Sequence, residues 1–169
     1  MKVVYIDTAN LSNENKKSNR ALDYEKFFLY FKNKYKSDRI IFFTGYLKSK
    51  ENKYNKLKEV GYEYIFKEVI FSEDSNKIKA NCDADICVTG VRNFFEENLK
   101  EAILVSSDGD YSVLMKFWIS KGVRVKIISP APPNKCSIFL KRLQIPITYI
   151  EQIFDLFKNE KALNVDKTT

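Results

Sequence analysis

Short apolar runs alternate with segments of helical periodicity along almost the whole chain. Runs of this kind predict strands buried on both faces, because a strand with one solvated face would alternate apolar and polar residues. The sequence IIFF, within the segment 39–46, is the clearest example. Strands that alternate with helices favour stacked βαβ units, and therefore an α/β fold with a mostly parallel sheet.

The same pattern sets the expected elements. Strands are predicted at residues 2–6, 39–46, 62–71, 102–106, 123–129 and 146–150. Helices are predicted at residues 22–36, 49–60, 83–99, 110–121, 137–143 and 152–158. Asp23 is the expected cap of the first helix, and Gly61 and Gly122 are expected to end two others. The strand at 62–71 is interrupted by charges, which places it near an edge of the sheet.

Acidic residues stand at the ends of these elements in three segments. The segments read VVYIDTAN at residues 3–10, KANCDADI at 79–86 and ILVSSDGDY at 103–111. They contribute Asp7, Asn10, Asp83, Asp108 and Asp110. Right-handed crossovers bring the C-terminal ends of parallel strands to one edge, so we expect these residues to meet in one crevice. Asp7 and Asp108 would flank the point where the strand order reverses.

At the start of the helix at 83–99, helical spacing indicates which of two acids is better directed toward the crevice. Asp83 shares a stripe with the apolar residues of that helix, which directs its carboxylate toward the crevice. Asp85 lies roughly 200° around the helix from Asp83 and ranks second. Asp83 and Asp110 also stand where Asp caps a helix or complements its dipole, so a structural role for each stays open.

Carboxylates that meet at one point repel each other unless a cation joins them. Asp7 is the hardest of the acids to explain structurally, because a charge directly after a buried strand is costly unless it is paired. Hard oxygen ligands suit Mg²⁺ or Mn²⁺. Such a site is suited to metal-assisted attack on a phosphodiester.

Composition narrows the functional classes. The chain has 29 Lys and Arg against 22 Asp and Glu, a net charge of +7, which favours a polyanionic partner. A Lys-rich composition that only reflects an AT-rich genome is the alternative. The complete lack of histidine excludes Ser-His-Asp, Cys-His and His-ligated zinc mechanisms.

Cysteine usage, apolar runs and chain length predict the compartment and the domain organisation. The three cysteines lack CxxC spacing and are expected to be reduced thiols in a cytoplasmic protein. No apolar run approaches a membrane span, and the N-terminus enters a strand at once, without a signal peptide. We expect one domain over residues 1–158 and a flexible polar tail over 159–169.

With these residues in view, the chain resembles a NYN domain of the PIN-like nuclease superfamily, in its LabA-like branch. The resemblance covers roughly residues 2–150 and is carried by the DxxN of YIDTAN, by KANCDADI and by SSDGDY. It implies a three-layer α/β/α sandwich with a mostly parallel central sheet, clustered acids that hold a divalent metal, and cleavage or binding of RNA. Ser107 stands where many relatives have glycine, and Asp85 where many have a neutral residue.

The resemblance and the acid set together imply a role for each residue. The catalytic and metal-binding residues would be Asp7, Asp83, Asp108 and Asp110. Asn10 and Ser106 would orient a carboxylate or a metal-bound water. Contacts to the substrate would come from Lys79, from Tyr111 stacking on a base, and from the polar stretch 12–20 with Lys16, Lys17 and Arg20. For that stretch, a solvated loop without function is the alternative, and for Tyr111 a core or rim aromatic.

The sequence thus predicts a metal-dependent ribonuclease that uses Mg²⁺ or Mn²⁺, in a two-metal type of hydrolysis. The alternative is an RNA-binding or scaffolding module that keeps the fold with little or no catalysis, although retained acids add nothing to a phosphate-binding surface. A DxDx(T/V) phosphatase motif and glycine-rich phosphate loops are absent from the sequence. No membrane partner is expected, and a homodimer is left open.

Overall fold

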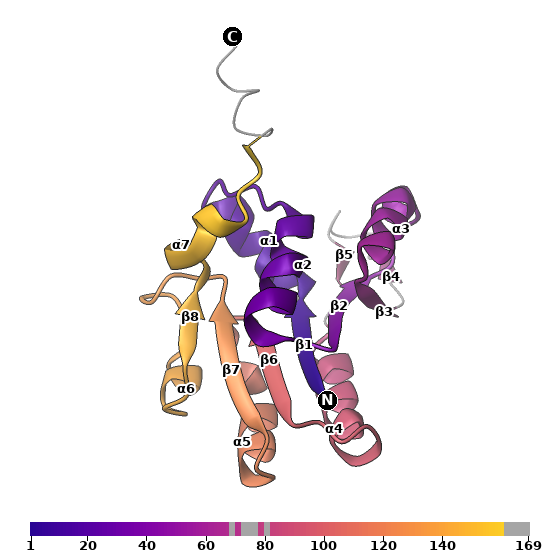
Figure 1. The fold of residues 1–169 in the computed structure, drawn as a ribbon. Coiled ribbons are helices and arrows are strands. Elements are labelled where there is room, and N and C mark those ends of the chain that lie inside the picture. The colour runs from indigo at the N-terminus through magenta and orange to yellow at the C-terminus, as the bar shows by residue number, and fades with distance from the viewer. Residues whose placement is uncertain (68–69, 72–77, 80–81, 161–169) are drawn as a thin grey trace.

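The computed structural model describes residues 1–67, 70–71, 78–79 and 82–160. At its centre six strands form a sheet in which every neighbouring pair is parallel, in the order β3-β2-β1-β6-β7-β8 (Figure 1). The strands are β1 (Lys2–Asp7), β2 (Arg39–Gly45), β3 (Glu63–Lys67), β6 (Glu101–Val105), β7 (Arg124–Ser129) and β8 (Ile147–Tyr149). Two short strands, β4 (Ile70–Phe71) and β5 (Ile78–Lys79), pair antiparallel to each other outside this sheet.

Helices cover both faces of the sheet. One face carries α1 (Thr8–Lys17), α2 (Tyr24–Tyr30), α3 (Glu51–Val60) and α7 (Ile150–Ile153). The other carries α4 (Asp83–Glu96), α5 (Ser112–Ser120) and α6 (Ile138–Lys141). The three-layer α/β/α architecture and the parallel sheet expected from the sequence are confirmed.

Strand β1 shows how two apolar cores form on one sheet. Val4 and Ile6 are buried among the residues of α1, α2 and α7, whereas Val3 and Tyr5 are buried against α4 and α5. Side chains alternate along a strand, so Asp7 continues the row of Val3 and Tyr5 and lies on the α4–α5 side. A strand buried on both faces thereby places its C-terminal charge, Asp7, at the edge of the sheet.

The topology places a reversal of strand order at the centre of the sheet. From β1 the chain adds β2 and then β3 on one side, and it returns to add β6, β7 and β8 on the other. Strands β1 and β6 are direct neighbours, with Ile6 opposite Val105. The residues that follow both strands therefore meet at the switch point, where ligands bind in open α/β sheets.

Several element boundaries differ from the expectation. For the polar stretch 12–20 a solvated loop was the alternative to a substrate contact, but most of it belongs to helix α1, which buries Leu11 and also the polar residues Glu14 and Asn15. The helix expected at 22–36 ends at Tyr30 and continues as a π-helical turn, Phe31–Tyr35. The strand expected at 62–71 ends at Lys67. It is an edge strand, as its internal charges indicated.

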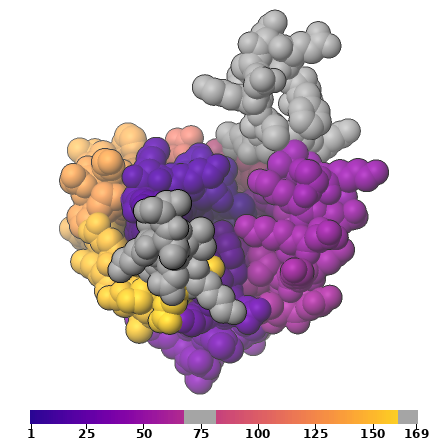
Figure 2. Space-filling view, turned by 90° about the horizontal axis from the view of Figure 1, so that it is seen from above, coloured from indigo at the N-terminus to yellow at the C-terminus, as the bar shows by residue number. Residues whose placement is uncertain are grey.

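The C-terminal segment also differs. Instead of a helix at 152–158, α7 ends at Ile153 and is followed by a 3₁₀ turn, Phe154–Leu156. Phe157 is fully buried against Phe27 of α2, with ring centroids 4.9 Å apart. Viewed onto the C-terminal ends of the strands, this yellow segment and α1 lie on one side of the molecule and α3 lies on the other (Figure 2).

The capping residues were predicted correctly. Asp23 accepts hydrogen bonds from the amides of Glu25 and Lys26 at the start of α2. Gly61 ends α3 with φ +115°, and Gly122 follows α5 with φ +74°. Both values lie in the left-handed region that glycine adopts without strain.

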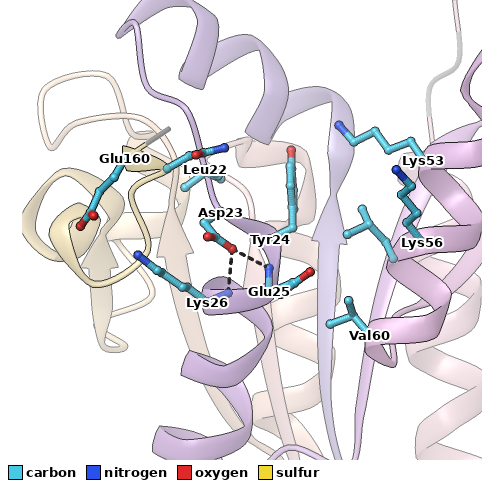
Figure 3. Close-up of a pocket in the computed structure, with 11 residues that line it drawn as sticks. Leu22, Asp23, Tyr24, Glu25, Lys26, Lys53, Lys56, Val60 and Glu160 are labelled. Carbon is cyan, nitrogen blue, oxygen red and sulfur yellow. Dashed lines mark hydrogen bonds between the residues drawn. The ribbon is translucent and has the colours of Figure 1, made fainter. Parts of the chain in front are cut away.

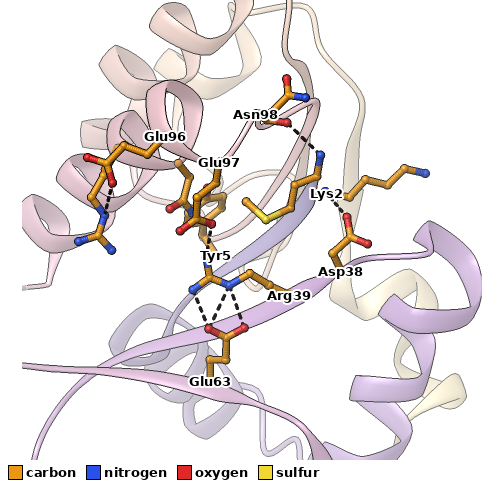
Figure 4. Close-up of polar contacts among 11 residues, drawn as sticks. Lys2, Tyr5, Asp38, Arg39, Glu63, Glu96, Glu97 and Asn98 are labelled. Atoms are coloured by element: carbon orange, nitrogen blue, oxygen red, sulfur yellow. Dashed lines mark hydrogen bonds and ion pairs between the residues drawn. The ribbon is translucent and has the colours of Figure 1, made fainter.

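An ion-pair cluster ties the edge of the sheet together far from the switch point. The guanidinium of Arg39, at the start of β2, binds both carboxylate oxygens of Glu63 on β3 and one of Glu97 at the end of α4 (Figure 4). These hydrogen bonds, opposed in part by burial, raise the pKa of Arg39. The cluster fixes the edge strand and the C-terminal end of α4 to the N-terminal edge of the sheet.

All three cysteines are unpaired, and Cys82 and Cys136 are buried. Within residues 1–67, 70–71, 78–79 and 82–160, no helix has the length and apolar character needed to cross a membrane. The tail expected over 159–169 lies outside the described residues, apart from Asn159 and Glu160.

Candidate functional site

Four of the acids named from the sequence lie at the switch point. Asp7 ends β1, Asp108 and Asp110 follow β6, and Asp83 is the first residue of α4. One carboxylate oxygen from each of Asp83, Asp108 and Asp110 lies within 4.8 Å of the other two. Asp83 is partly buried, whereas Asp110 is exposed, so the cluster opens to solvent on one side.

The chemistry of this donor set fits a hard divalent cation. Its ligands are carboxylate oxygens, without sulfur or imidazole. Octahedral Mg²⁺ ligands lie roughly 2.1 Å from the ion, which places adjacent ligands about 3 Å and opposite ligands about 4.2 Å apart. The 4.8 Å bound is slightly wider than this, so small side-chain rotations, or an intervening water, would bring the three carboxylates to one ion.

Asp7 lies behind the cluster and is buried, with 6% of its surface exposed. Its Oδ1 accepts from the amide of Asn10 at 3.0 Å, and its Oδ2 accepts from the hydroxyls of Ser106 at 3.3 Å and Tyr111 at 3.1 Å. Burial raises the pKa of Asp7 above its ordinary value of 3.8, although the hydrogen bonds from Asn10 and Tyr111 oppose that rise. The charge of Asp83 adds to the increase.

Tyr111 connects Asp7 to the cluster. It is completely buried, and its hydroxyl lies 2.6 Å from Oδ1 of Asp83 and 3.1 Å from Oδ2 of Asp7. Burial, together with the two carboxylates, raises the pKa of Tyr111, which keeps the phenol protonated. A phenol has one hydrogen to donate, so it serves one of the two carboxylates at a time.

The loop after β6 is held by its own hydrogen bonds. The hydroxyl of Ser106 accepts from the amide of Asp108 at 3.2 Å, while it donates to Asp7. Oδ1 of Asp108 accepts from the amide of Asp110 at 3.0 Å and caps a short 3₁₀ turn, Gly109–Tyr111. These contacts hold both loop acids at the same edge as Asp83.

The chain matches a known protein family over most of its length. The NYN domain matches residues 2–144, which is most of the 169-residue chain. The chain belongs to the NYN domain family. The family predicted from the YIDTAN, KANCDADI and SSDGDY segments is therefore confirmed, while the LabA-like branch stays a prediction.

The NYN domain is also similar to a solved structure. It resembles the crystal structure of a protein of unknown function from Vibrio parahaemolyticus RIMD 2210633, with a TM-score of 0.72 and 19% sequence identity. The match covers 93% of this chain and 94% of that chain. At this level of identity the likeness shows the shared fold alone. No curated protein matches the chain.

Several residues of this NYN domain play a different part from the one expected. Tyr111 is fully buried, so it has no free face on which a base could stack. Asn10 contacts Asp7 through its backbone amide, whereas its side-chain oxygen accepts from the amide and hydroxyl of Ser107. Asn10 therefore fixes the loop after β6, and Ser106 has the carboxylate-orienting position predicted for it.

The basic residues expected to contact substrate are only partly available for it. Lys17 forms an ion pair with Glu14 one turn earlier on α1. Arg20 donates to the hydroxyl of Ser18 and the carbonyl of Pro130, both at 2.9 Å, which fastens the end of α1 to the loop after β7. Lys16 is exposed on α1, and the side chain of Lys79 lies outside the described residues. These positions remain predictions.

Sequence reasoning missed the contacts that shape the loop. Ser107 was noted only as a departure from glycine, but its hydroxyl donates to Asn10 at 2.8 Å. Ser137, before α6, lies so close to Gly109 that a Cβ there would come within 2.3 Å of the serine oxygen. A glycine is thus required at position 109 because Ser137 approaches it closely, and not because the backbone has a positive φ there. Asp85, ranked second to Asp83, pairs with Lys67 at 3.2 Å instead of joining the cluster.

Proposed function

We propose that this NYN domain is a metal-dependent ribonuclease that hydrolyses RNA phosphodiester bonds. The observation that carries the proposal is the convergence of Asp83, Asp108 and Asp110, whose carboxylate oxygens lie within 4.8 Å of each other. NYN domains have a nuclease-like fold and are generally ribonucleases, which agrees with this arrangement. The net charge of +7 suits a polyanionic substrate.

Asp83, Asp108 and Asp110 would hold one or two Mg²⁺ or Mn²⁺ ions, with Asp7 behind them. When bound, such a metal supplies a water of lowered pKa and positive charge beside the phosphate. The residues of the chain position these ligands. Tyr111 fixes the carboxylate of Asp83 from the protein side, which leaves its other oxygen for the ion.

Asp7 is a positioning residue in this proposal. Burial raises its pKa above the ordinary value, and the charge of Asp83 adds to that rise. The hydroxyl of Ser106 donates to Asp7 and accepts from the amide of Asp108. Asp7 is thereby linked through one side chain to the loop that carries two of the ligands.

Cleavage of labelled RNA tests the proposal. Single-stranded and structured RNAs are incubated with purified protein and Mn²⁺, Mg²⁺ or EDTA. We expect cleavage with either metal, none in EDTA, and loss of cleavage by Asp83→Asn. Asp155→Asn is the matched control, because it removes the same charge from an exposed side chain outside the cluster.

The outcome separates the enzyme from the alternative. RNA that binds but stays intact under every metal condition would support the non-catalytic RNA-binding module instead. Cleavage that survives in Asp83→Asn, or in EDTA, would show that the acidic cluster is not the catalytic site.

A further inference from the structure

A groove lies between helices α2 and α3, on the face of the sheet opposite the acidic cluster. Its outer part has a volume of about 510 Å³ and its inner part about 60 Å³. Tyr24, Lys53 and Leu57 line both parts, so the two hollows are adjacent, and together they are called here the α2–α3 groove. Figure 3 shows its outer part, with Lys53 extending from α3 toward Tyr24 at the start of α2.

The inner end of the α2–α3 groove lies at the same sheet edge as the acidic cluster. Thr8 lines it, and Thr8 directly follows Asp7 in the chain, so their Cα atoms are roughly 3.8 Å apart. Thr44 lines it too and follows Phe43, the residue of β2 that pairs with Asp7. A strand of nucleic acid that crosses the C-terminal edge of β1 would reach the cluster and the groove together.

The charges at the inner end are positive. Lys50 and Lys53 line it, and none of the described residues that line it carries a carboxylate. The ammonium of Lys53 lies 4.8 Å from the ring centroid of Tyr24, and neither lysine has an ion-pair partner among the residues that the structure describes. Partial desolvation and the neighbouring Lys50 lower the pKa of Lys53. An anion bound between the two lysines would relieve this repulsion.

The other polar groups at the inner end are hydroxyls. They belong to Thr8, Ser12, Thr44, Tyr54 and Tyr64, and those of Thr44 and Tyr54 already donate to the carbonyl of Gly45. Oγ1 of Thr8 is shielded from solvent and has no hydrogen-bond partner among the described residues. A buried hydroxyl without a partner is unusual in a folded protein. Ammonium groups and hydroxyls that face one small space are the donors that a phosphate group requires.

The two volumes indicate what each part would hold. The inner part equals about two waters at their share of liquid volume, roughly 30 Å³ each, which suits phosphate oxygens and excludes a whole base. The outer part is several times larger, and Tyr24 and Leu57 give it apolar walls. Lys26 and Lys56 also line it, together with the carboxylates of Asp23, Glu25 and Glu160, of which Asp23 is already used to cap α2.

We propose that the α2–α3 groove binds the RNA segment next to the scissile phosphate, with Lys50 and Lys53 on a backbone phosphate and an adjoining nucleotide in the outer part. This proposal rests on the ribonuclease function proposed above and adds the path of the substrate. The strand runs from the acidic cluster across the start of α1 toward α3. The end of α1, with Lys17 and Arg20 already engaged, is not on this path.

The test compares two double variants with equal changes of charge. Lys50→Gln with Lys53→Gln removes both ammonium groups from the groove. Lys116→Gln with Lys121→Gln is the control, because these exposed lysines lie on α5 and at its C-terminal end, away from the groove and the acidic cluster. Binding of a fluorescein-labelled single-stranded RNA is measured by anisotropy in EDTA, over a range of salt concentrations, and thermal melting checks that each variant is folded.

We expect the groove variant to bind RNA roughly tenfold more weakly, or worse, than the control, as the loss of charge-assisted contacts implies. The logarithm of the binding constant falls linearly with the logarithm of the salt concentration, and each phosphate contact to a single strand contributes about 0.7 to the steepness of that line. The line for the groove variant should therefore be less steep by about 0.7 to 1.4. In the Asp108→Asn protein, photo-crosslinking of RNA that contains 4-thiouridine should label Tyr24, Tyr54 or Tyr64, and mass spectrometry locates the label.

The possible failures are distinct. If the wild type cuts RNA but the groove variant binds like the control and the crosslinks map elsewhere, the substrate path is wrong and the ribonuclease function stands. If the wild type neither binds nor cuts any RNA, both proposals fail. If the groove variant is unfolded, the crosslinks in the Asp108→Asn protein, which keeps Lys50 and Lys53, decide whether RNA lies in the groove.

Discussion

At the scale of single residues, one hydroxyl connects the core to the acidic cluster. The phenol of Tyr111 contacts Asp7 and Asp83, two carboxylates contributed by β1 and α4. The tyrosine is buried, so water cannot replace the hydroxyl without a cavity opening. The carboxylate of Asp83 is therefore oriented by a residue that the substrate does not touch.

Tyr111→Phe should remove this orientation while it keeps the ring packed. Hydrogen bonds to charged groups are worth about 1.5–3 kcal/mol, so we expect the free energy of unfolding to fall by about that amount. Metal-dependent RNA cleavage should fall at least roughly tenfold, because Asp83 loses its fixed position. Urea unfolding and cleavage assays measure the two effects. Tyr46→Phe is the control, because this exposed tyrosine donates its hydroxyl hydrogen to Glu51, outside the acidic cluster.

The raised pKa of Asp7 predicts a pH dependence for the metal-free protein. Burial raises this pKa above 3.8, so between 3.8 and the folded-state value the folded protein binds more protons than the unfolded chain. The contribution of Asp7 to the free energy of unfolding is therefore greatest below pH 3.8, and it is lost as pH rises through the folded-state pKa. Asp7→Asn should lose less stability over this range than the wild type does. Urea unfolding in EDTA at a series of pH values compares them, and equal slopes would contradict the assignment.

At the scale of elements, the position of α4 decides where Asp83 lies. Helices α4 and α5 cross closely at Gly90, whose carbonyl accepts from Nε1 of the fully buried Trp118 at 3.2 Å. A Cβ at this glycine would come within 2.5 Å of Cζ2 of Trp118. The absence of a side chain at Gly90 thus lets the indole pack closely against the helix that begins with Asp83.

Gly90→Ala should force these two helices apart. Overpacking of a dense core costs about 1–3 kcal/mol, and the better helix propensity of alanine offsets at most about 1 kcal/mol of it. We expect a net loss in the free energy of unfolding, measured by urea titration. Val88→Ala, at an exposed position on the same helix, should change stability by less than about 0.5 kcal/mol. Equal stability of Gly90→Ala and the wild type would mean that the crossing adjusts freely.

At the scale of the whole molecule, a basic protein concentrates negative charge at one place. The net charge is +7, yet Asp83, Asp108 and Asp110 meet at the centre of the C-terminal sheet edge. Such a cluster destabilises the metal-free fold through repulsion, and a bound cation would reverse that effect. The stability of the molecule should therefore depend on metal concentration.

Asp108→Asn separates the structural and chemical parts of this effect. The amide oxygen of asparagine can still accept from the amide of Asp110, so the loop should keep its turn. We expect metal-dependent cleavage to be abolished, RNA binding in EDTA to be retained, and the Tm of the metal-free protein to be equal or higher. Mg²⁺ at 100 times its Kd should stabilise the wild type by about 2.7 kcal/mol, and the variant much less. An unfolded variant, or one that still cleaves, would make Asp108 a structural residue.

Apolar runs and caps along the chain were enough to predict the layers of the fold. Strand burial follows from local runs such as IIFF, and helix ends follow from residues such as Asp23 and Gly61, whose effects act within one turn. The right-handed crossover rule then placed Asp7 and the residues after β6 at one edge. Element boundaries were wrong where tertiary packing overrode the local pattern, as in α1, whose mostly polar sequence forms a helix that buries Leu11, Glu14 and Asn15.

The amino-acid sequence by itself determined the α/β class, the family and the acids that end the central strands, because periodicity and short motifs are local properties. Only the tertiary structure decided that Tyr111 is shared by two carboxylates, that Ser137 leaves no room for a side chain at Gly109, and that Lys50 and Lys53 line a groove beside Asp7. Each of these contacts joins residues far apart in the chain. They exist because sheet register and helix packing fix distances that no local pattern encodes.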